Sequence, residues 1–291
     1  MFASLHEAGD NSGMNAYGTL YVVATPIGNL ADLSQRAREV LCMVDWVAAE
    51  DTRHSGPLLK HVNSTAKLLP LHEHNEQQAS PALIAALQSG KNIALISDAG
   101  TPAISDPGAM LVAQAHAAGV RVEPVPGANA AVCALSAAGL TNPGWLFYGF
   151  LPARDAARQS VLEKLADLPW PLVFYEAPHR ILASVAALYA GLGERRLVIA
   201  RELTKRYESI HVLPLSEAEA WLVADGQRQK GEFVLVVSPA PPVIATETDE
   251  LRRVLQVLME ELPLKQAVHL ATRLTGIKKN LCYDLALQLK A

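Results

Sequence analysis

The chain has 291 residues, of which 50% are hydrophobic and 19% are charged, and its formal net charge is −4. This length corresponds to about two domains of roughly 150 residues, and the apolar content excludes an intrinsically disordered chain. The slightly negative charge excludes a globally basic surface for nucleic-acid binding, but not a local basic patch.

Neither the cysteines nor the histidines have the spacing of a metal site. Cys42, Cys133 and Cys282 are far apart and form no CxxC pair, so we expect small buried thiols rather than a disulfide framework or a zinc site. Four histidines lie between positions 54 and 74 without HxxxH or HExxH spacing, and we expect no metal.

No segment has the pattern of a targeting signal or a membrane span. Residues 1–16 lack the basic start and apolar centre of a signal peptide, and we expect them to form a flexible leader. The most apolar run, residues 127–140, is shorter than the ~20 residues that a spanning helix needs. We therefore expect a cytoplasmic protein without a membrane segment.

In the first half of the chain, short β-rich runs alternate with amphipathic helical runs, which predicts a parallel or mixed α/β sheet. The expected strands are residues 19–24, 46–49, 68–71, 92–96 and 120–125. The expected helices are residues 33–44, 77–88 and 106–118, the first of them capped by Asp32 or Ser34. These elements predict an N-terminal α/β domain over residues 17–128.

A second α/β domain is predicted over residues 129–240. Its expected strands are residues 145–150, 172–175, 196–200, 210–213 and 232–237, and its expected helices are residues 129–138, 154–166, 180–190 and 216–224. Since neighbouring strands near its end have no helix between them, we expect this sheet to be partly antiparallel. A proline-rich linker at 238–242 precedes a small helical domain over 245–291, with two short helices joined at Gly276.

Four of the expected strands end in loops that are rich in glycine and proline. These loops are Thr25–Leu30, Ser97–Gly108, Pro126–Asn129 and Glu176–Arg180. Functional residues of parallel α/β sheets gather at such strand ends, and these residue types let the backbone approach a ligand closely. No GxxxxGK[ST] or GxGxxG motif is present. The pattern alone thus predicts an α/β enzyme with a cleft between two domains and leaves its ligand open.

Particular motifs carry a resemblance to a known family. They are TLYVVATPIGNL from Thr19, AEDTR from Ala49, HEHNE from His72, SDAGTP with SDPG from Ser97, FYEAPHR from Phe174 and ARELTKRYE from Ala200. In this order they resemble the ribosomal RNA small-subunit methyltransferase I family, from Gly18 to the C-terminus. That family has the two-domain tetrapyrrole-methylase-like fold, a non-Rossmann class of methyltransferase. The loop Thr25–Asn29 replaces the Pro-Gly-Asp loop of true tetrapyrrole methylases, which favours the RNA branch.

The resemblance implies a homodimer that holds S-adenosylmethionine between its two α/β domains and releases S-adenosylhomocysteine. It implies 2′-O-methylation of a cytidine, cytidine 1402, in the 16S ribosomal RNA of the 30S subunit. The cofactor contacts that it implies are Pro26, Gly28, Ser97, Asp98, Ala99, Gly100, Thr101, Ile104, Asn129, Ala130, Glu176 and Leu203.

A neutral ribose hydroxyl is a poor nucleophile, so a general base or a strong hydrogen-bond acceptor is expected. Candidates within the family motifs are Glu50, Asp51, Glu176 and His179, with Glu73 and Glu202 as further carboxylates. RNA contacts are expected from Arg53, His72, His74, Arg180, Arg201, Lys205 and Arg206. For the helical tail, an RNA-contacting role and a packing or dimer role remain equal alternatives.

Two other functions remain open on the sequence. One is C-methylation of a tetrapyrrole, such as a corrin or sirohaem precursor. The other is a non-enzymatic RNA-binding role in ribosome assembly, because a fold alone does not settle function.

Overall fold

The computed structural model describes residues 17–241 and 247–290. The chain divides into two compact units, one up to Pro239 and one from Ala240 onward, each with its own hydrophobic core. None of the described helices is long and apolar enough to cross a membrane.

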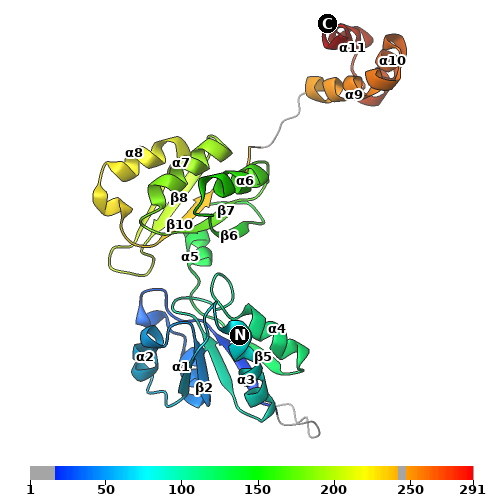
Figure 1. Cartoon of the computed structure of the whole chain (residues 1–291). Helices are drawn as coiled ribbons and strands as arrows, with labels where there is room; N and C mark the ends of the chain where they lie inside the picture. Colours follow the sequence, from blue (N-terminus) through cyan, green and yellow to red (C-terminus); the bar gives the residue numbers. More distant parts are fainter. Residues whose placement is uncertain (1–16, 242–246, 291) are drawn as a thin grey trace, which may run out of the picture. The chain divides into compact units, whose positions relative to one another are not determined.

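The first unit begins with a five-stranded parallel sheet in the order β3-β2-β4-β1-β5 (Figure 1). Its strands are β1 (Thr19–Val23), β2 (Trp46–Ala49), β3 (Lys67–Pro70), β4 (Ile93–Ile96) and β5 (Arg121–Val125). Its helices are α1 (Gln35–Met43), α2 (Thr52–His61), α3 (Glu76–Gln88) and α4 (Ala109–Ala117), with the short 3-10 helix η1 (Leu30–Asp32) before α1. The central strand β4 is buried along its whole length, as expected for a strand with helices on both faces.

The two faces of this sheet have separate cores. One core contains Val40 and Leu41 of α1 with Leu59 of α2, and the other contains Leu87 of α3 with Leu111 of α4. The predicted strands and helices of this half are confirmed, and Ser34 is the residue that caps α1.

Helix α2 is absent from the sequence prediction, and Cys42 departs from it. Gly56 and Pro57 are helix-breaking residue types, yet α2 continues through both, with the Asp51 side chain capping its first turn. Tertiary packing of Leu59 outweighs the local propensity. Cys282 is buried as expected, but Cys42 is exposed, with its Sγ donating to the Val62 carbonyl oxygen at 3.0 Å.

The second sheet has the order β6-β7-β10-β8-β9 and mixed directions, which confirms the predicted antiparallel part. Its strands are β6 (Leu146–Phe150), β7 (Leu172–Glu176), β8 (Arg196–Arg201), β9 (Ser209–Pro214) and β10 (Phe233–Val237). Its helices are α5 (Ala130–Ala137), α6 (Asp155–Leu165), α7 (Ile181–Leu192) and α8 (Ala218–Val223), with short 3-10 helices η2 (Leu215–Glu217) and η3 (Gly226–Gln229). Helix α5 covers one face, while α6, α7 and α8 cover the other (Figure 1).

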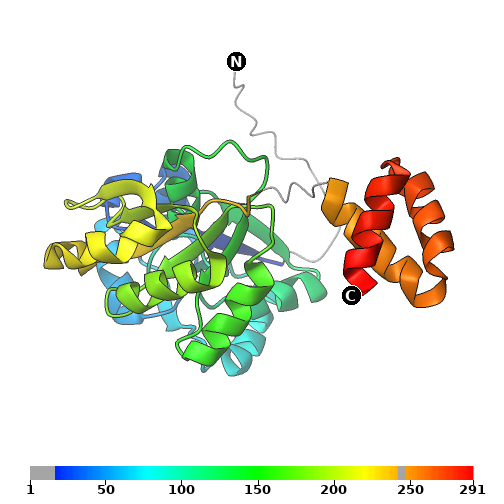
Figure 2. The same cartoon turned by 90° about the horizontal axis from the view of Figure 1, so that it is seen from above.

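The second unit is a bundle of helices α9 (Glu247–Glu261), α10 (Leu264–Thr275) and α11 (Lys279–Lys290), which pack against one another (Figure 2). Leu255, Val268 and Cys282 contribute one buried side chain from each helix to its core. Helix α10 ends at Gly276, whose φ of 73° gives the left-handed conformation that glycine adopts easily, at the predicted junction.

Candidate functional site

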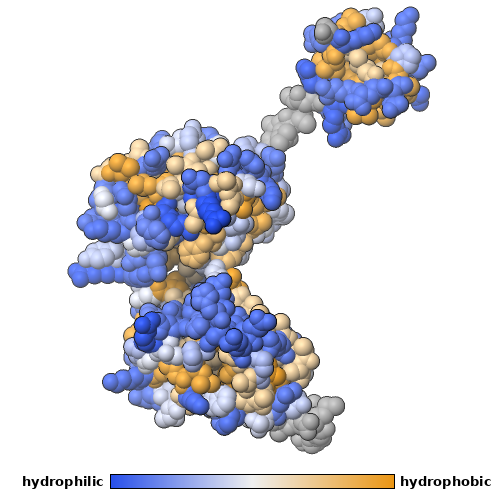
Figure 3. Space-filling view, in the orientation of Figure 1, coloured by the Kyte–Doolittle hydropathy of each residue, from blue (hydrophilic) through white to orange (hydrophobic). Residues whose placement is uncertain are grey.

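A cavity of about 310 Å³ lies between the two sheets of the first unit, and the hollow is visible in Figure 3. Its walls come from the loops after β1, β4 and β5 and from β7, β8 and β10. The predicted cofactor residues on its walls are Ala99, Gly100, Thr101, Ile104, Asn129, Ala130, Glu176 and Leu203. The remaining predicted cofactor residues, Pro26, Gly28, Ser97 and Asp98, line a second cavity of about 460 Å³. The two cavities adjoin, because both are lined by Ile27, Ala99, Lys205 and Glu232.

Hydrogen bonds to main-chain carbonyl groups join the three loops that come from the first sheet. Thr25 and Gly100 exchange amide-to-carbonyl bonds of 2.8 and 3.1 Å, although they lie at the ends of different strands. The buried Thr25 hydroxyl donates to the Ser97 carbonyl oxygen at 3.1 Å, and the Thr101 hydroxyl donates to that of Ala128 at 3.1 Å. Gly100 has a φ of 84°, a conformation that residues with a Cβ rarely adopt. The cavity wall is therefore fixed by a pair of main-chain hydrogen bonds together with the hydroxyls of Thr25 and Thr101.

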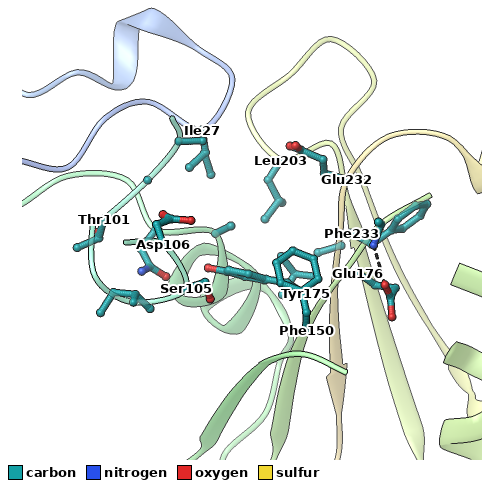
Figure 4. A pocket seen from close by; sticks show the side chains of 18 of the residues that line it. Ile27, Thr101, Ser105, Asp106, Phe150, Tyr175, Glu176, Leu203, Glu232 and Phe233 are labelled. Atoms are coloured by element: carbon teal, nitrogen blue, oxygen red, sulfur yellow. Dashed lines mark hydrogen bonds between the residues drawn. The ribbon is translucent and has the colours of Figure 1, made fainter. Parts of the chain in front are cut away.

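Three carboxylates, Glu50, Asp98 and Asp106, lie near one another at this wall. Of the three, Asp106 is the one that lines the first cavity (Figure 4). Burial raises the pKa of Asp106, a hydrogen bond from Ser97 opposes the shift, and the nearby charge of Asp98 adds to it. Burial also raises the pKa of Glu50, with further contributions from Asp106 and Asp98. Among the described residues, no group of three or more His, Cys, Asp or Glu could hold a metal ion.

Asp106 is absent from the predicted site residues, although it lies within the predicted loop Ser97–Gly108. The available signal was a second carboxylate eight positions after Asp98 in the same glycine-rich loop. Tyr175 and Phe150 are also on the cavity wall without having been predicted, and the Tyr175 hydroxyl points toward the side where Asp106 lies (Figure 4). That hydroxyl accepts a hydrogen bond from the Ala131 amide at 3.3 Å.

The predicted bases occupy less suitable positions. Asp51 caps α2 through the Arg53 amide and pairs with the Arg53 guanidinium at 2.7 Å, which lowers its pKa to about 2. Glu50 is partly buried and outside the lining of both cavities. His179 is exposed in the turn before α7, also outside both linings.

Glu176 borders the cavity, but its carboxylate has internal partners. It is 2% exposed, accepts hydrogen bonds from the Ala177 amide at 2.8 Å and from the Ser184 hydroxyl, and pairs with Arg180 at 3.3 Å. In Figure 4 the carboxylate is turned away from Asp106. This arrangement holds the end of β7 against α7. Of the two further carboxylates, Glu73 is exposed and Glu202 is bonded to Lys205 at 2.9 Å.

Two of the predicted RNA-contacting arginines have internal partners. Arg201 donates to the Ser209 hydroxyl and to the carbonyl oxygens of Gln227, Lys230 and Tyr207. Arg180 donates to the carbonyl oxygen of Leu151 as well as pairing with Glu176. Both guanidinium groups therefore hold segments around the second sheet together, Arg201 through four hydrogen bonds and Arg180 through its contacts with Leu151 and Glu176.

The other predicted RNA contacts lie in different surroundings. The side chain of Arg53 is 90% exposed, His74 is exposed, and His72 is partly buried beside it, with ring centroids 6.1 Å apart. Arg206 is exposed and lies over the Tyr207 ring at 5.6 Å. Lys205 lies in the wall between the two cavities.

The ammonium group of Lys205 is bonded to Glu202 at 2.9 Å and to Glu232 at 2.7 Å. Burial lowers its pKa, but the hydrogen bonds and charges of Glu232 and Glu202 outweigh burial and raise it. The Lys205 side chain also covers Gly28, where an added Cβ would lie 2.4 Å from its Cγ. Lys205 thus remains a neutralised cation at the wall that the two cavities share.

Known protein families and solved structures share this architecture. Residues 19–219 match the model of the family described as Tetrapyrrole (Corrin/Porphyrin) Methylases, and residues 245–290 match that of the RsmI C-terminal HTH domain. A uroporphyrin-III-C-methyltransferase structure from Thermus thermophilus has a TM-score of 0.52 and 22% identity, covering 77% of this chain and 95% of its own. A cobalt precorrin-4 methyltransferase structure has a TM-score of 0.56 and 17% identity, covering 79% and 98%. The fold and the cavity thus define a methyltransferase of the tetrapyrrole methylase class.

Relatives with similar sequences identify the family within this class. The Escherichia coli O157:H7 protein named Ribosomal RNA small subunit methyltransferase I is 50% identical over 284 residues, covering 97% of this chain and 98% of its own. The Pseudomonas aeruginosa protein of that name is 52% identical over 274 residues, covering 93% and 97%. The chain belongs to the ribosomal RNA small subunit methyltransferase I family.

Proposed function

We propose that the chain transfers a methyl group from S-adenosylmethionine to the ribose 2′-hydroxyl of a cytidine, cytidine 1402, in the 16S ribosomal RNA of the small subunit. The observation that carries the proposal is the identity of 50 to 52% to relatives of that name over nearly the whole chain, the C-terminal unit included. One structure of the fold, the Thermus thermophilus uroporphyrin-III C-methyltransferase, was solved with S-adenosylhomocysteine, which fits a cofactor of this kind.

The first cavity has the chemistry that this cofactor requires. Asp106 supplies a carboxylate at one side, while Leu203, Phe233 and Val234 supply an apolar wall suited to an adenine ring. Ala99 and Thr101 line the same cavity on either side of Gly100, whose own amide and carbonyl groups are bonded to Thr25. When bound, S-adenosylmethionine supplies a methyl group that is already activated by a positively charged sulfur.

The residues of the chain then have to align the acceptor, exclude water and take up a proton. Of the carboxylates that line the first cavity, Glu176 and Glu232 are paired with Arg180 and Lys205, which leaves Asp106. Its raised pKa makes it a better proton acceptor than Asp51, whose pKa is lowered. We therefore favour Asp106 over the predicted bases Glu50, Asp51 and His179. The same carboxylate offsets the positive charge of the cofactor, which an uncharged residue cannot do.

The direct test is transfer of a labelled methyl group from S-adenosylmethionine to purified, unmodified 30S subunits, followed by nucleoside analysis. We expect a labelled 2′-O-methylcytidine. Cofactor binding without incorporation would instead point to a small tetrapyrrole acceptor, while the absence of both would support the non-enzymatic assembly role.

The family also leads us to propose a homodimer that works in the cytoplasm, with RNA contacts from Arg53, His72, His74 and Arg206. Lys265, Arg273, Lys278 and Lys279 give the C-terminal unit several cations on and beside α10, which favours an RNA-contacting role for it. Sedimentation of the purified protein tests the dimer. Deletion of residues from 240 onward, measured as affinity for 30S subunits, tests the role of the unit.

A further inference from the structure

The second cavity adjoins the first but differs from it in composition. Each cavity has a carboxylate of its own, Asp106 in the first and Asp98 in the second, but only the second is lined by Arg53 and His54 of helix α2. Leu30, Ser55, Pro57 and Leu58 also line the second cavity and not the first. Its volume of about 460 Å³ lies in the range of small-molecule sites, roughly 300–1,000 Å³. The shared wall means that a molecule held here would lie next to the contents of the first cavity.

Ser55 brings to this cavity a hydroxyl group that is unpaired among the described residues. It is 2% exposed, it lines the second cavity, and its Oγ has no hydrogen-bond partner within the described part of the chain. A helical serine can donate to the carbonyl oxygen four residues earlier, here that of Asp51, but this bond is absent. Because buried polar atoms in folded proteins almost always have partners, the hydroxyl marks a position for a polar group of a ligand.

Arg53 lies two residues before Ser55 and is oriented toward solvent. Its guanidinium is held by Asp51 through hydrogen bonds of 3.1 and 2.7 Å, while its side chain remains 90% exposed. An oriented guanidinium with free donors matches the geometry of a phosphate group. Both Lys205 and Arg53 are paired with carboxylates, but the Lys205 ammonium group is bonded to two of them, Glu202 and Glu232, whereas Arg53 uses only Nε and Nη2 on its single partner Asp51.

The second cavity also has apolar side chains in its wall. Leu30 is 49% exposed and Pro57 is exposed, although both are large apolar residues next to a cavity. Apolar side chains can contact the flat face of a nucleobase that is no longer stacked on its neighbours.

We propose that the second cavity is the acceptor subsite and that it takes one unstacked nucleotide of the RNA strand. Arg53 binds a phosphate of that nucleotide, Ser55 bonds a polar group of the nucleoside, and Leu30 with Pro57 contacts the base. The assignment rests on the proposed function, because it places the acceptor beside the first cavity as the cofactor site. A nucleotide must leave its stack to enter, so the substrate is single-stranded or locally opened RNA.

The test compares Arg53→Gln, Ser55→Ala and Leu30→Trp with the wild type in methyl transfer to 30S subunits. Each variant is expected to lose at least tenfold in kcat/KM for 30S subunits, with the Kd for S-adenosylmethionine within twofold of the wild type. Arg121→Gln is the matched control, because Arg121 is 75% exposed and pairs with a carboxylate two residues away, Glu123 at 2.9 Å, outside both cavities. It is expected to behave as the wild type.

Ser55→Ala separates a binding role from a structural one. Its hydroxyl has no partner in the protein alone, so the variant is expected to keep or raise its melting temperature while it loses activity. If all three variants methylate 30S subunits as well as Arg121→Gln does, the acceptor subsite lies elsewhere and the proposed function still stands. If the wild type binds S-adenosylmethionine but methylates no RNA, the proposed function fails and the subsite assignment fails with it.

Discussion

The Glu76 carboxylate accepts a hydrogen bond from the Gly108 amide at 3.0 Å, and so joins the start of α3 to the end of the cavity loop. The same oxygen accepts from the Met110 amide at 2.9 Å and from the Leu111 amide at 3.2 Å. Because Gly108 is itself the N-cap residue of α4 and has no side chain to cap with, a residue from another helix satisfies the first turn. The loop Ser97–Gly108 is thereby anchored at its far end.

Replacing Glu76 by alanine is expected to destabilise the fold by about 1–2 kcal/mol, the range for loss of a charged helix cap. Urea unfolding measures this change. The matched control is Glu73→Ala, which removes an exposed carboxylate of the same motif and is expected to change stability by less than about 0.5 kcal/mol. Equal effects of the two substitutions would show that the cap is not stabilising.

Asp106→Asn is expected to weaken binding of S-adenosylmethionine by about tenfold or more, equivalent to ~1.4 kcal/mol per tenfold. S-adenosylhomocysteine has no positive charge on its sulfur, so its affinity should fall much less. Calorimetric titration of both compounds with both proteins gives the comparison. A uniform loss for the two compounds would mean that Asp106 acts through shape rather than charge.

The pKa of Asp106 also predicts a pH dependence of cofactor binding. Since burial raises this pKa above the ordinary value, Asp106 becomes protonated at a higher pH than an exposed aspartate does. Affinity for the positively charged cofactor should therefore be full near neutral pH and fall as the pH decreases through the raised value. The Asp106→Asn variant should lack this decline, and titrations at several pH values would detect it.

The raised pKa of Asp106 gives the stability of the fold the opposite pH dependence. A folded-state pKa above the unfolded value means that the folded protein binds protons more tightly, so this contribution favours folding at low pH and is lost as the pH rises through the raised pKa. Asp106→Asn should consequently have an equal or higher melting temperature than the wild type at neutral pH without cofactor. A clearly lower one would contradict the burial of its charge.

Arg201 and Arg206 should separate structure from RNA contact. Arg201→Ala removes four hydrogen bonds to neighbouring loops and is expected to destabilise the fold by ~1.5–3 kcal/mol. Arg206→Ala removes an exposed cation and is expected to leave stability unchanged while it reduces the salt dependence of RNA binding by roughly 0.7–0.9 in the log–log slope. The reverse pattern would restore Arg201 as the RNA contact.

Much of the fold could be predicted from the sequence because the signals were local. The buried strand Ile93–Ile96 is a continuous apolar run, and the junction at Gly276 needs only one glycine after an amphipathic segment. Helix α2 could not be predicted in this way. Its Gly56–Pro57 pair opposes a helix locally, and only the packing of Leu59 against the sheet reverses that preference.

The roles of site residues were harder to predict because they depend on partners distant in sequence. The strand-end loops did identify the region of both cavities. Nothing local showed that the Glu176 carboxylate would be bonded by Ser184, or that Arg201 would be used by Gln227 and Lys230. The sequence does not separate Asp106 from Asp98, because both are aspartates of one loop and only the structure shows that they line different cavities.

The pair of backbone hydrogen bonds between Thr25 and Gly100 affects how proteins of this fold can diversify. Both hydrogen bonds are made by amide and carbonyl groups, which every residue other than proline provides. Apart from Thr25 and Thr101, whose hydroxyls bond neighbouring carbonyl groups, side chains in both loops can therefore be exchanged without breaking these bonds, provided that position 100 accepts a φ of 84°. A binding site whose frame depends on few of its own side chains can change its acceptor while it keeps its methyl donor. The frame is thus suited to acceptors as different as a porphyrin ring and a strand of RNA.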